Sequence, residues 1–206
     1  MRKQRVLHLV LVAQRFTAAT TGIFRVGFSH CGEFVAPSVF LAILPLTSRY
    51  NGGVPFRIRQ FEKADFDTLW RIDQACFDPQ LAYSRPELAF YVRRPGSFTL
   101  VAEGDGAILG FTVAEARRKT GHIITIDVIA QSRRSGVGSA LLDAAEGQLL
   151  RAGASTVALE TPVNNDAAIH FYKQKGYFVE KTVAGYYSGQ LDALVMTKEL
   201  DQPPAV

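Results

Sequence analysis

The chain has 206 residues, 48% of them hydrophobic and 20% charged, which suits one ordinary globular domain with some excess length. No stretch approaches the roughly 20 consecutive apolar residues that a membrane-spanning helix needs. The two cysteines and four histidines show no disulfide framework and no ligand spacing, so we expect no metal and a cytoplasmic, reducing compartment.

The net charge of +4 is spread unevenly along the chain. Residues 1–55 hold six of the 23 basic residues and one of the 19 acidic residues, whereas the other 151 residues hold 17 basic and 18 acidic residues. The basicity therefore belongs to the N-terminal segment, and the rest of the chain lacks the positive surface of a nucleic-acid-binding domain. We expect no direct binding of nucleic acid and no membrane association.

Residues 1–54 contain apolar pieces without a sustained period of 2 or 3.6 residues, so no regular element is predicted there. Their basic start and short apolar stretch imitate a signal peptide, but the apolar stretch holds His8 and no small-residue cleavage site precedes Arg15. A poorly ordered extension, a targeting segment and a misplaced start are the three interpretations. A domain over 55–201 and a tail over 202–206 are expected to follow.

Within that domain, alternating or β-branched runs predict seven strands, at 56–61, 98–103, 108–116, 122–129, 156–161, 177–184 and 193–199. Apolar residues at helical spacing predict four helices, at 66–76, from 85 to before Pro95, and at 137–152 and 166–175. Asp65 is the N-cap expected for the first helix, Pro86 lies near the start of the second, and Gly176 closes the last. The order β-αα-βββ-α-β-α-ββ is that of an α/β domain with a mixed central sheet of about seven strands.

Residues 123–142 have the pattern of an anion-binding loop between a strand and a helix. A β-branched run over 123–129, which predicts a strand buried on both faces, is followed by two arginines and by Gly136-Val137-Gly138. Glycine lets a ligand approach the backbone, and free N–H groups at a helix start bind anions. The loop lacks the Lys-Ser/Thr of a P-loop, and Leu141 stands where a dinucleotide-binding loop has its third glycine. A glycine-softened loop over a buried helix is the alternative.

Three motifs in the same order resemble those of the GCN5-related N-acetyltransferases, the GNAT family. The first is R-x-x-G-x-G at 133–138, after a strand, and the second is N-x-x-A-I-x-x-Y-x-x-x-G-Y at 165–177. The third, at 186–196, is similar to the carboxy-terminal part of protein N-terminal acetyltransferases, notably the ribosomal-protein alanine acetyltransferases. The resemblance covers about residues 56–200, and the family has the same order of elements, so it implies the GNAT fold.

The resemblance implies acetyl-CoA as the acyl donor, without a metal. The strand edge is expected to be free after residue 126 and to present N–H groups to the thioester and pantetheine, while the loop holds the pyrophosphate. The implied cofactor-binding residues are Ile126, Asp127, Val128, Arg133, Arg134, Ser135, Gly136, Val137, Gly138, Ser139 and Asn165. On the residues alone, the alternative for Arg133 and Arg134 is that they are solvated surface residues, and the alternative for Asn165 is a helix N-cap.

The resemblance also assigns two catalytic residues. Glu160 ends an apolar strand at the position of the family's general base, acting directly or through a water. Tyr172 stands at the tyrosine position of the second motif, where the family's general acid commonly lies. On the residues alone, the alternative for Glu160 is a solvated strand-end carboxylate, and the alternative for Tyr172 is a core aromatic whose hydroxyl reaches water.

In protein N-terminal acetyltransferases, the loop between the first two helices and the loop between the last two strands line a peptide groove. The corresponding residues here are Phe77, Pro79, Tyr83, Tyr186 and Tyr187. Local packing of the loops is the alternative for each. Two departures put the ribosomal-protein type in doubt: Thr161-Pro162 replaces a typical Val-Arg, and residues 77–80 lack a Phe-Pro pair followed by tryptophan.

The sequence thus predicts an acetyl-CoA-dependent N-acetyltransferase whose acceptor is a primary amine, above all the α-amine of a protein or peptide N-terminus. A ribosomal protein is one such acceptor. Direct attack in a ternary complex is expected, because no cysteine lies near the motif residues in the sequence. The alternatives are a small-molecule amine as acceptor, or a non-catalytic acyl-CoA-binding regulatory module, against which the presence of both Glu160 and Tyr172 argues.

Overall fold

The computed structural model describes Thr47–Ser48 and residues 55–201, which belong to one compact unit. The interpretations of the other residues before 55, and of the tail at 202–206, lie outside the described residues. Within the described part of the chain, no helix is long and apolar enough to cross a membrane. The same residues contain no group of His, Cys, Asp and Glu side chains that could hold a metal ion.

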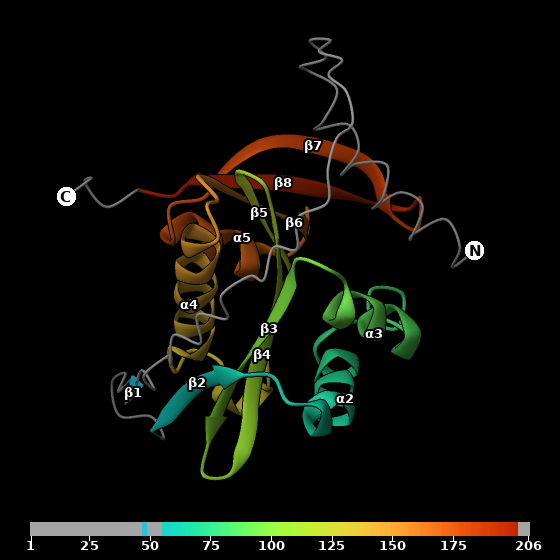
Figure 1. Ribbon diagram of the computed structural model, residues 1–206. Helices are drawn as coiled ribbons and strands as arrows, with labels where there is room; N and C mark the ends of the chain where they lie inside the picture. Colours follow the sequence, from blue (N-terminus) through green and yellow to red (C-terminus); the bar gives the residue numbers. More distant parts are fainter. Residues whose placement is uncertain (1–46, 49–54, 202–206) are drawn as a thin grey trace, which may run out of the picture. The chain divides into compact units, whose positions relative to one another are not determined.

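A mixed sheet forms the centre of the domain (Figure 1). Its strands are β1 (Thr47–Ser48), β2 (Phe56–Gln60), β3 (Ser97–Gly104), β4 (Ala107–Arg117), β5 (Thr120–Val128), β6 (Thr156–Pro162), β7 (Phe178–Tyr187) and β8 (Leu191–Glu199). They lie in the order β1-β2-β3-β4-β5-β6-β8-β7, and all neighbours are antiparallel except β5 and β6. The fold class and the order of elements are confirmed, and the short β1, paired with β2, adds an eighth strand to the expected seven.

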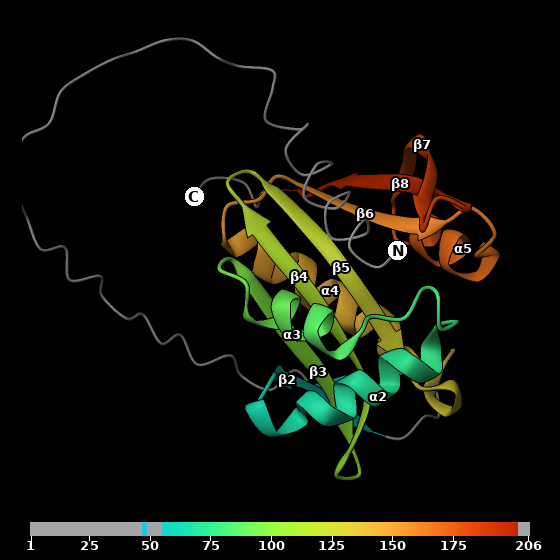
Figure 2. The same cartoon turned by 90° about the vertical axis from the view of Figure 1, so that its right-hand side faces the viewer.

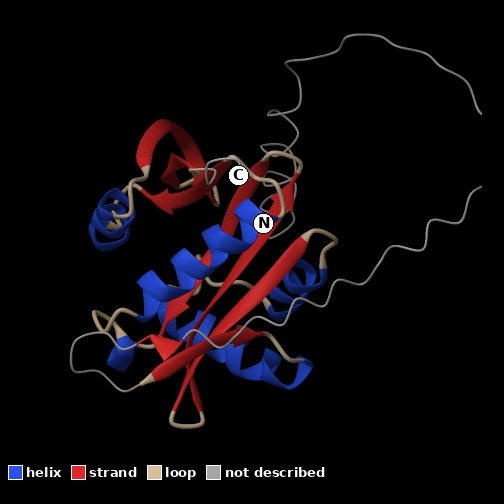
Figure 3. Ribbon diagram, turned by 60° about the vertical axis from the view of Figure 1, so that its left-hand side comes forward, coloured by secondary structure: helices blue, strands red, loops and turns tan. Residues whose placement is uncertain are grey.

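Helices cover both faces of the sheet (Figures 1 and 3). On one face, α4 (Val137–Arg151) contacts β2 to β5, while α2 (Phe66–Cys76) and α3 (Arg85–Arg93) contact β3, β4 and β5 on the other. The last helix, α5 (Asp166–Gln174), connects β6 to β7. The main core lies under α4, where its fully buried Leu141, Leu142 and Leu149 pack against apolar residues of the strands. This packing places the N-terminus of α4 beside the end of β5.

The residues expected to cap the N-termini of α2 and α3 differ in what their side chains bind. Asp65 directly precedes α2 as expected, but its side chain does not cap that helix. Its carboxylate instead accepts hydrogen bonds from Arg59 at 2.7 and 3.0 Å, because β2 carries this arginine toward it. Ser84 and Glu87 form a capping box at α3, and Pro86 lies in its first turn as predicted.

An extra residue in β5 changes which face its side chains reach. Adjacent residues of β4 pair with Ile123 and Thr125, so Ile124 forms a β-bulge. The bulge interrupts the alternation of side chains along the strand. Ile123 joins the core beneath α4, whereas Asp127, buried with Thr125, interacts electrostatically with Asp73 of α2.

Beyond the bulge, β5 and β6 separate. Their parallel pairing joins Thr120 through Ile123 with Thr156 through Leu159 and then stops. β5 continues along β4, and β6 continues along β8, so the two strands diverge (Figure 2). Among the described strands, none pairs with this edge of β5 after Ile123, three residues before the predicted position. A bulge increases local twist, which accounts for the earlier separation.

We expect Leu141→Ala to lower the free energy of unfolding by about 2–5 kcal/mol, because the residue is fully buried under the N-terminal half of α4. Urea denaturation followed by circular dichroism measures the change. Arg151→Ala, an exposed position on the same helix, is the control and should shift stability by less than about 0.5 kcal/mol. Equal losses in the two variants would contradict this account of the core.

Candidate active site

The loop between β5 and α4 presents backbone N–H groups at a helix start. Gly136 precedes α4 with a φ of 88°, a left-handed conformation that glycine adopts without a steric penalty. The helix has no side-chain cap, and the N–H of Ala140 donates to the carbonyl of Gly136 at 2.9 Å. The N–H groups of Val137, Gly138 and Ser139 therefore have no partner within the helix. Together with the helix dipole they form an anion site.

Gly138 leaves room above this helix start. A methyl group there would meet Val128 and Phe171 at 3.7 and 3.8 Å, which is ordinary van der Waals contact. The packing of the protein therefore does not itself require a glycine at this position. Space for a ligand close to the backbone is the physical reason that remains.

The polar side chains of the loop are arranged around its backbone. The Nε group of Arg133 donates to the carbonyl of Val128 at 3.1 Å, which ties this arginine to the end of β5. Arg134 is exposed, with a φ of 63° in the left-handed region. The hydroxyl of Ser135 donates to the carbonyl of Ser132 at 2.7 Å, a hydrogen bond within the loop. Both arginines leave their charges at the surface, next to the anion site.

The predicted cofactor strand carries a buried carboxyl. Ile126 and Val128 pack on the core beneath α4, whereas Asp127 is buried and accepts a hydrogen bond from the Thr125 hydroxyl at 3.0 Å. Its Oδ2 atom has no hydrogen-bond partner. Burial, and then the negative charge of Asp73, raise the pKa of Asp127 well above its ordinary value. The Asp127 side chain is therefore enclosed by the protein, and its backbone faces Phe111 of β4 rather than the open edge of β5.

Asn165 caps α5, the alternative that its position before Asp166 left open. Its Oδ1 atom accepts a hydrogen bond from the N–H of Ala168 at 3.1 Å. The side-chain amide nitrogen remains the group that can donate to a cofactor. The two interpretations of Asn165 are thus compatible.

Tyr172 of α5 is an aromatic core residue with a protonated hydroxyl. Its ring packs against Phe171 and Tyr177, with centroid distances of 5.2 and 5.7 Å. Burial, and then the negative charge of Asp127, raise the pKa of Tyr172 above its ordinary value. The phenol therefore keeps its proton near neutral pH.

Glu160 is bound by a histidine that the sequence did not single out. Its Oε2 atom lies 2.7 Å from Nε2 of His122 on β5, and the two side chains are 12% and 27% exposed. Tyr186 of β7, which is almost fully buried, also hydrogen-bonds Glu160. His122 stands 38 residues before Glu160. The sequence did not indicate this contact, because the pairing register of two strands cannot be read from spacing along the chain.

The electrostatics of this pair favour two charged partners. Burial by itself would lower the pKa of His122, but the charge and hydrogen bond of Glu160, and then the charge of Glu115, outweigh it, so that pKa is raised. Burial would likewise raise the pKa of Glu160, but His122, followed by Tyr186 and Lys181, brings it below its ordinary value. Glu160 is therefore a carboxylate near neutral pH.

A cysteine lies closer to the site than the sequence indicated. Cys76, the last residue of α2, has its Sγ atom 3.4 Å from the carbonyl of Val128, because α2 packs against β5. The expectation that no cysteine lies near the motif residues is therefore wrong in space. Burial, and then the charge of Asp127, raise the pKa of Cys76. A thiol that stays protonated is a poor nucleophile.

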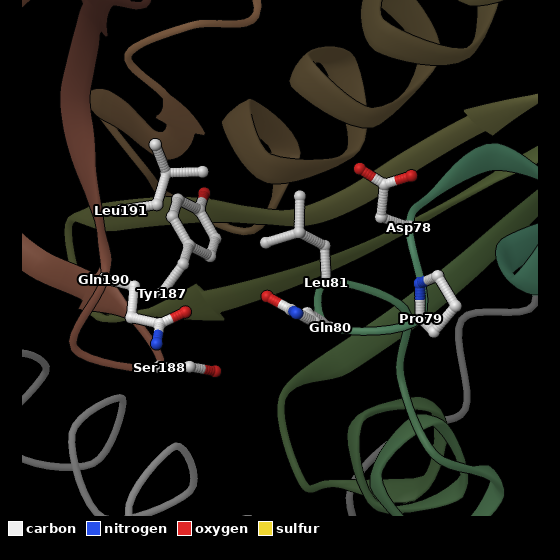
Figure 4. Close-up of a pocket in the computed structure, with 8 residues that line it drawn as sticks. All are labelled: Asp78, Pro79, Gln80, Leu81, Tyr187, Ser188, Gln190 and Leu191. Atoms are coloured by element: carbon white, nitrogen blue, oxygen red, sulfur yellow. The ribbon is translucent and has the colours of Figure 1, made fainter.

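A groove of about 380 Å³ opens between the loop after α2 and the β7–β8 turn (Figure 4). It is lined by Asp78, Pro79, Gln80, Leu81, Tyr187, Ser188, Gln190 and Leu191. Figure 4 shows Tyr187 and Leu81 on opposite sides of the groove, with the side chains of Gln80 and Gln190 beside them. Apolar walls with a few amides suit an extended peptide.

The five predicted substrate residues occupy different places around this groove. Pro79 and Tyr187 line it, whereas Phe77, Tyr83 and Tyr186 are not among its lining residues. The N–H of Tyr83 donates to Asp73 at 2.8 Å, and the rings of Tyr186 and Tyr187 lie 4.9 Å apart. Tyr186 touches Glu160 and Tyr187 faces the groove, so two adjacent residues connect the groove to the carboxylate.

Comparison with known proteins agrees with this geometry. Residues 66–177 match the model of the acetyltransferase (GNAT) family. An uncharacterized N-acetyltransferase of Methanocaldococcus jannaschii is 33% identical over 143 residues, covering 69% of this chain and 90% of that protein. An N-alpha-acetyltransferase of Sulfurisphaera tokodaii is 29% identical over 164 residues, covering 72% and 95%. The crystal structure of Ard1 from Thermoplasma volcanium has a TM-score of 0.66 at 29% identity, covering 71% of this chain and 99% of that one.

We expect Gly138→Ala to weaken CoA binding by about tenfold or more, equivalent to at least about 1.4 kcal/mol. The added methyl group fits the protein but fills the space above the helix start. Alanine also favours the helix, so the free energy of unfolding should not fall.

Gly136→Ala should instead lower the free energy of unfolding by about 1–2 kcal/mol, because the φ of 88° at this position is strained for alanine. Isothermal titration with CoA and urea denaturation test both variants, and unchanged CoA affinity in Gly138→Ala would refute the first expectation.

The His122 pKa should fall when its partner loses its charge. In Glu160→Gln the largest raising contribution is removed while burial remains. Because the folded-state pKa of wild-type His122 is raised, the pair stabilises the fold fully below the ordinary histidine pKa of about 6.5, and this stabilisation is lost as the pH rises through the folded-state value. NMR titration of the imidazole measures the shift, with exposed His170 as the internal control. An equal or higher pKa in the variant would contradict the pairing.

Proposed function

The chain belongs to the acetyltransferase (GNAT) family and is an N-acetyltransferase, and from this premise we propose that its acceptor is the α-amine of a protein N-terminus. The observation that supports this acceptor is the groove between the loop after α2 and the β7–β8 turn, which is lined mainly by apolar and amide side chains. The likeness to an N-alpha-acetyltransferase over 72% of the chain agrees with it.

The donor is acetyl-CoA, whose thioester supplies the acetyl group and whose sulfur leaves as a thiolate. The described residues fit this molecule at three places. The free N–H groups and arginines at the start of α4 suit its pyrophosphate, the space above Gly138 admits it, and the unpaired edge of β5 presents backbone groups to its arm. The amide nitrogen of Asn165 can add a donor to the same arm.

Glu160 would remove the proton of the acceptor amine. An α-ammonium has an ordinary pKa of about 7.7–8.0, so the amine must lose a proton before it attacks a carbonyl. Tyr186 joins the Glu160 carboxylate to its neighbour Tyr187 in the groove, and the low pKa of Glu160 keeps it ionised and able to accept a proton. It acts on the amine directly or through one water.

Tyr172 would supply the proton that the departing thiolate needs. Its hydroxyl is protonated because of burial and the charge of Asp127 on the cofactor strand. The base and the acid thus come from β6 and α5, elements that are consecutive in the chain.

We propose direct attack of the amine in a ternary complex. Cys76 lies near the strand, but its raised pKa leaves it as a thiol, so it does not suit an acyl-carrying nucleophile. Cys76→Ala should therefore retain turnover. A burst of acetylated enzyme that disappears in this variant would overturn the direct route.

Turnover of acetyl-CoA with a panel of N-terminal peptides and free amines tests the function. We expect a peptide terminus to be the best acceptor, and Glu160→Gln and Tyr172→Phe each to lower kcat by about 10²-fold, the scale of general acid–base catalysis. The panel includes an alanine terminus of ribosomal-protein type, to which the resemblance of residues 186–196 points. Wild-type turnover in both variants would overturn the catalytic assignment, and a preference for free amines would overturn the acceptor.

A further inference from the structure

We infer that His122 is a positioning residue for Glu160, holding Oε2 of the carboxylate so that Oε1 faces the acceptor amine. This inference rests on the proposed function, in which Glu160 is the base. The contact that carries it is the 2.7 Å distance between Nε2 of His122 and Oε2 of Glu160, across the neighbouring strands β5 and β6.

A base that removes a proton must be held in one orientation. A free glutamate side chain rotates about three bonds, and a misplacement of about 1 Å can cost about 100-fold in rate. Glu160 stands near the place where β5 and β6 separate, so strand pairing with β5 no longer surrounds it. His122 and the buried Tyr186 are the groups that hydrogen-bond its carboxylate. His122 thus fixes the position of one defined oxygen, Oε2.

His122 stands beside a row of alternating charges on the sheet. It pairs across the strands with Glu115 of β4, which is 4% exposed. Glu115 in turn contacts Nε of Arg94 at 3.3 Å and Nε of Arg117 at 2.6 Å. The row therefore runs from arginine through Glu115 and His122 to Glu160, with opposite charges side by side. It joins the end of α3 to the base.

The groups that face the pair set its protonation. Glu160, Glu115 and Arg94 act on His122, while Tyr186 and Lys181 also act on Glu160. A histidine donates from Nε2 both as imidazolium and as the neutral tautomer protonated there. Positioning therefore needs the N–H group and not the charge, and glutamine, which also carries an N–H donor, should replace histidine in this role.

The test compares three variants in the acetyl-CoA turnover assay with the best acceptor. His122→Leu, which has no donor, should lower kcat by about 100-fold with little change in the KM for acetyl-CoA. His122→Gln should recover most of this loss, and His170→Leu, at an exposed position of α5, controls for the loss of a histidine. Wild-type kcat in His122→Leu, or equal losses in the leucine and glutamine variants, would overturn the inference. Thermal unfolding of each variant checks that it is folded.

The pH dependence of kcat gives a second measurement that a structural role alone would not change. Both His122 variants lack the positive charge that lowers the pKa of Glu160, while burial still raises it. The acid limb of kcat should therefore move to higher pH in both, and an unmoved limb would count against the inference.

Glu160→Gln distinguishes the role of the base from the role of His122. If this variant turns over at the wild-type rate, the proposed base is wrong. A slow Glu160→Gln with a fast His122→Leu rejects the positioning role alone.

Discussion

The separation of β5 from β6 after Ile123 is the constraint on which the site depends. Two parallel strands that stayed paired would consume the backbone groups of β5 and close the space between the sheet halves. The bulge at Ile124 adds a residue and twist at this point, so β5 follows β4 while β6 follows β8. The open edge, the start of α4 and the carboxylate of Glu160 all lie around this divergence. The site thus forms where the pairing of β5 with β6 ends.

The two proposed catalytic groups are shifted in opposite directions by their surroundings. Burial disfavours charge at both positions, but Glu160 has His122 beside it and keeps its negative charge. Among the described residues, Tyr172 has no positive partner, and burial followed by the nearby Asp127 raises its pKa, so the phenol stays protonated. Proton transfer from the amine needs an ionised base, and proton transfer to the thiolate needs a protonated acid. The opposite directions of the two pKa shifts come from the charged neighbour of each group, because burial alone would raise both pKa values.

Local patterns predicted the elements well, and the misses share one cause. Residues 137–151 were recognisable as a helix from their apolar spacing, and Gly136 and Gly138 identified the loop before it. Asp65 was expected to cap α2, but Arg59 on a neighbouring strand binds it instead. Cys76 was distant from the motifs in sequence and proved adjacent to Val128. In each miss, tertiary packing provides a contact that the local pattern does not indicate, whether the partner lies six residues away, as Arg59 does, or 52, as Val128 does.

By itself, the sequence determined the fold class, the anion loop and the family likeness, because these depend on local spacing of glycine, apolar and capping residues. Only the tertiary structure decided what surrounds Glu160. His122 reaches it through the register of two parallel strands, and Tyr186 through a strand that follows α5. Register depends on how the whole sheet packs, and a shift of one residue would turn His122 to the other face. The spacing of residues along the chain therefore does not predict the register of β5 and β6.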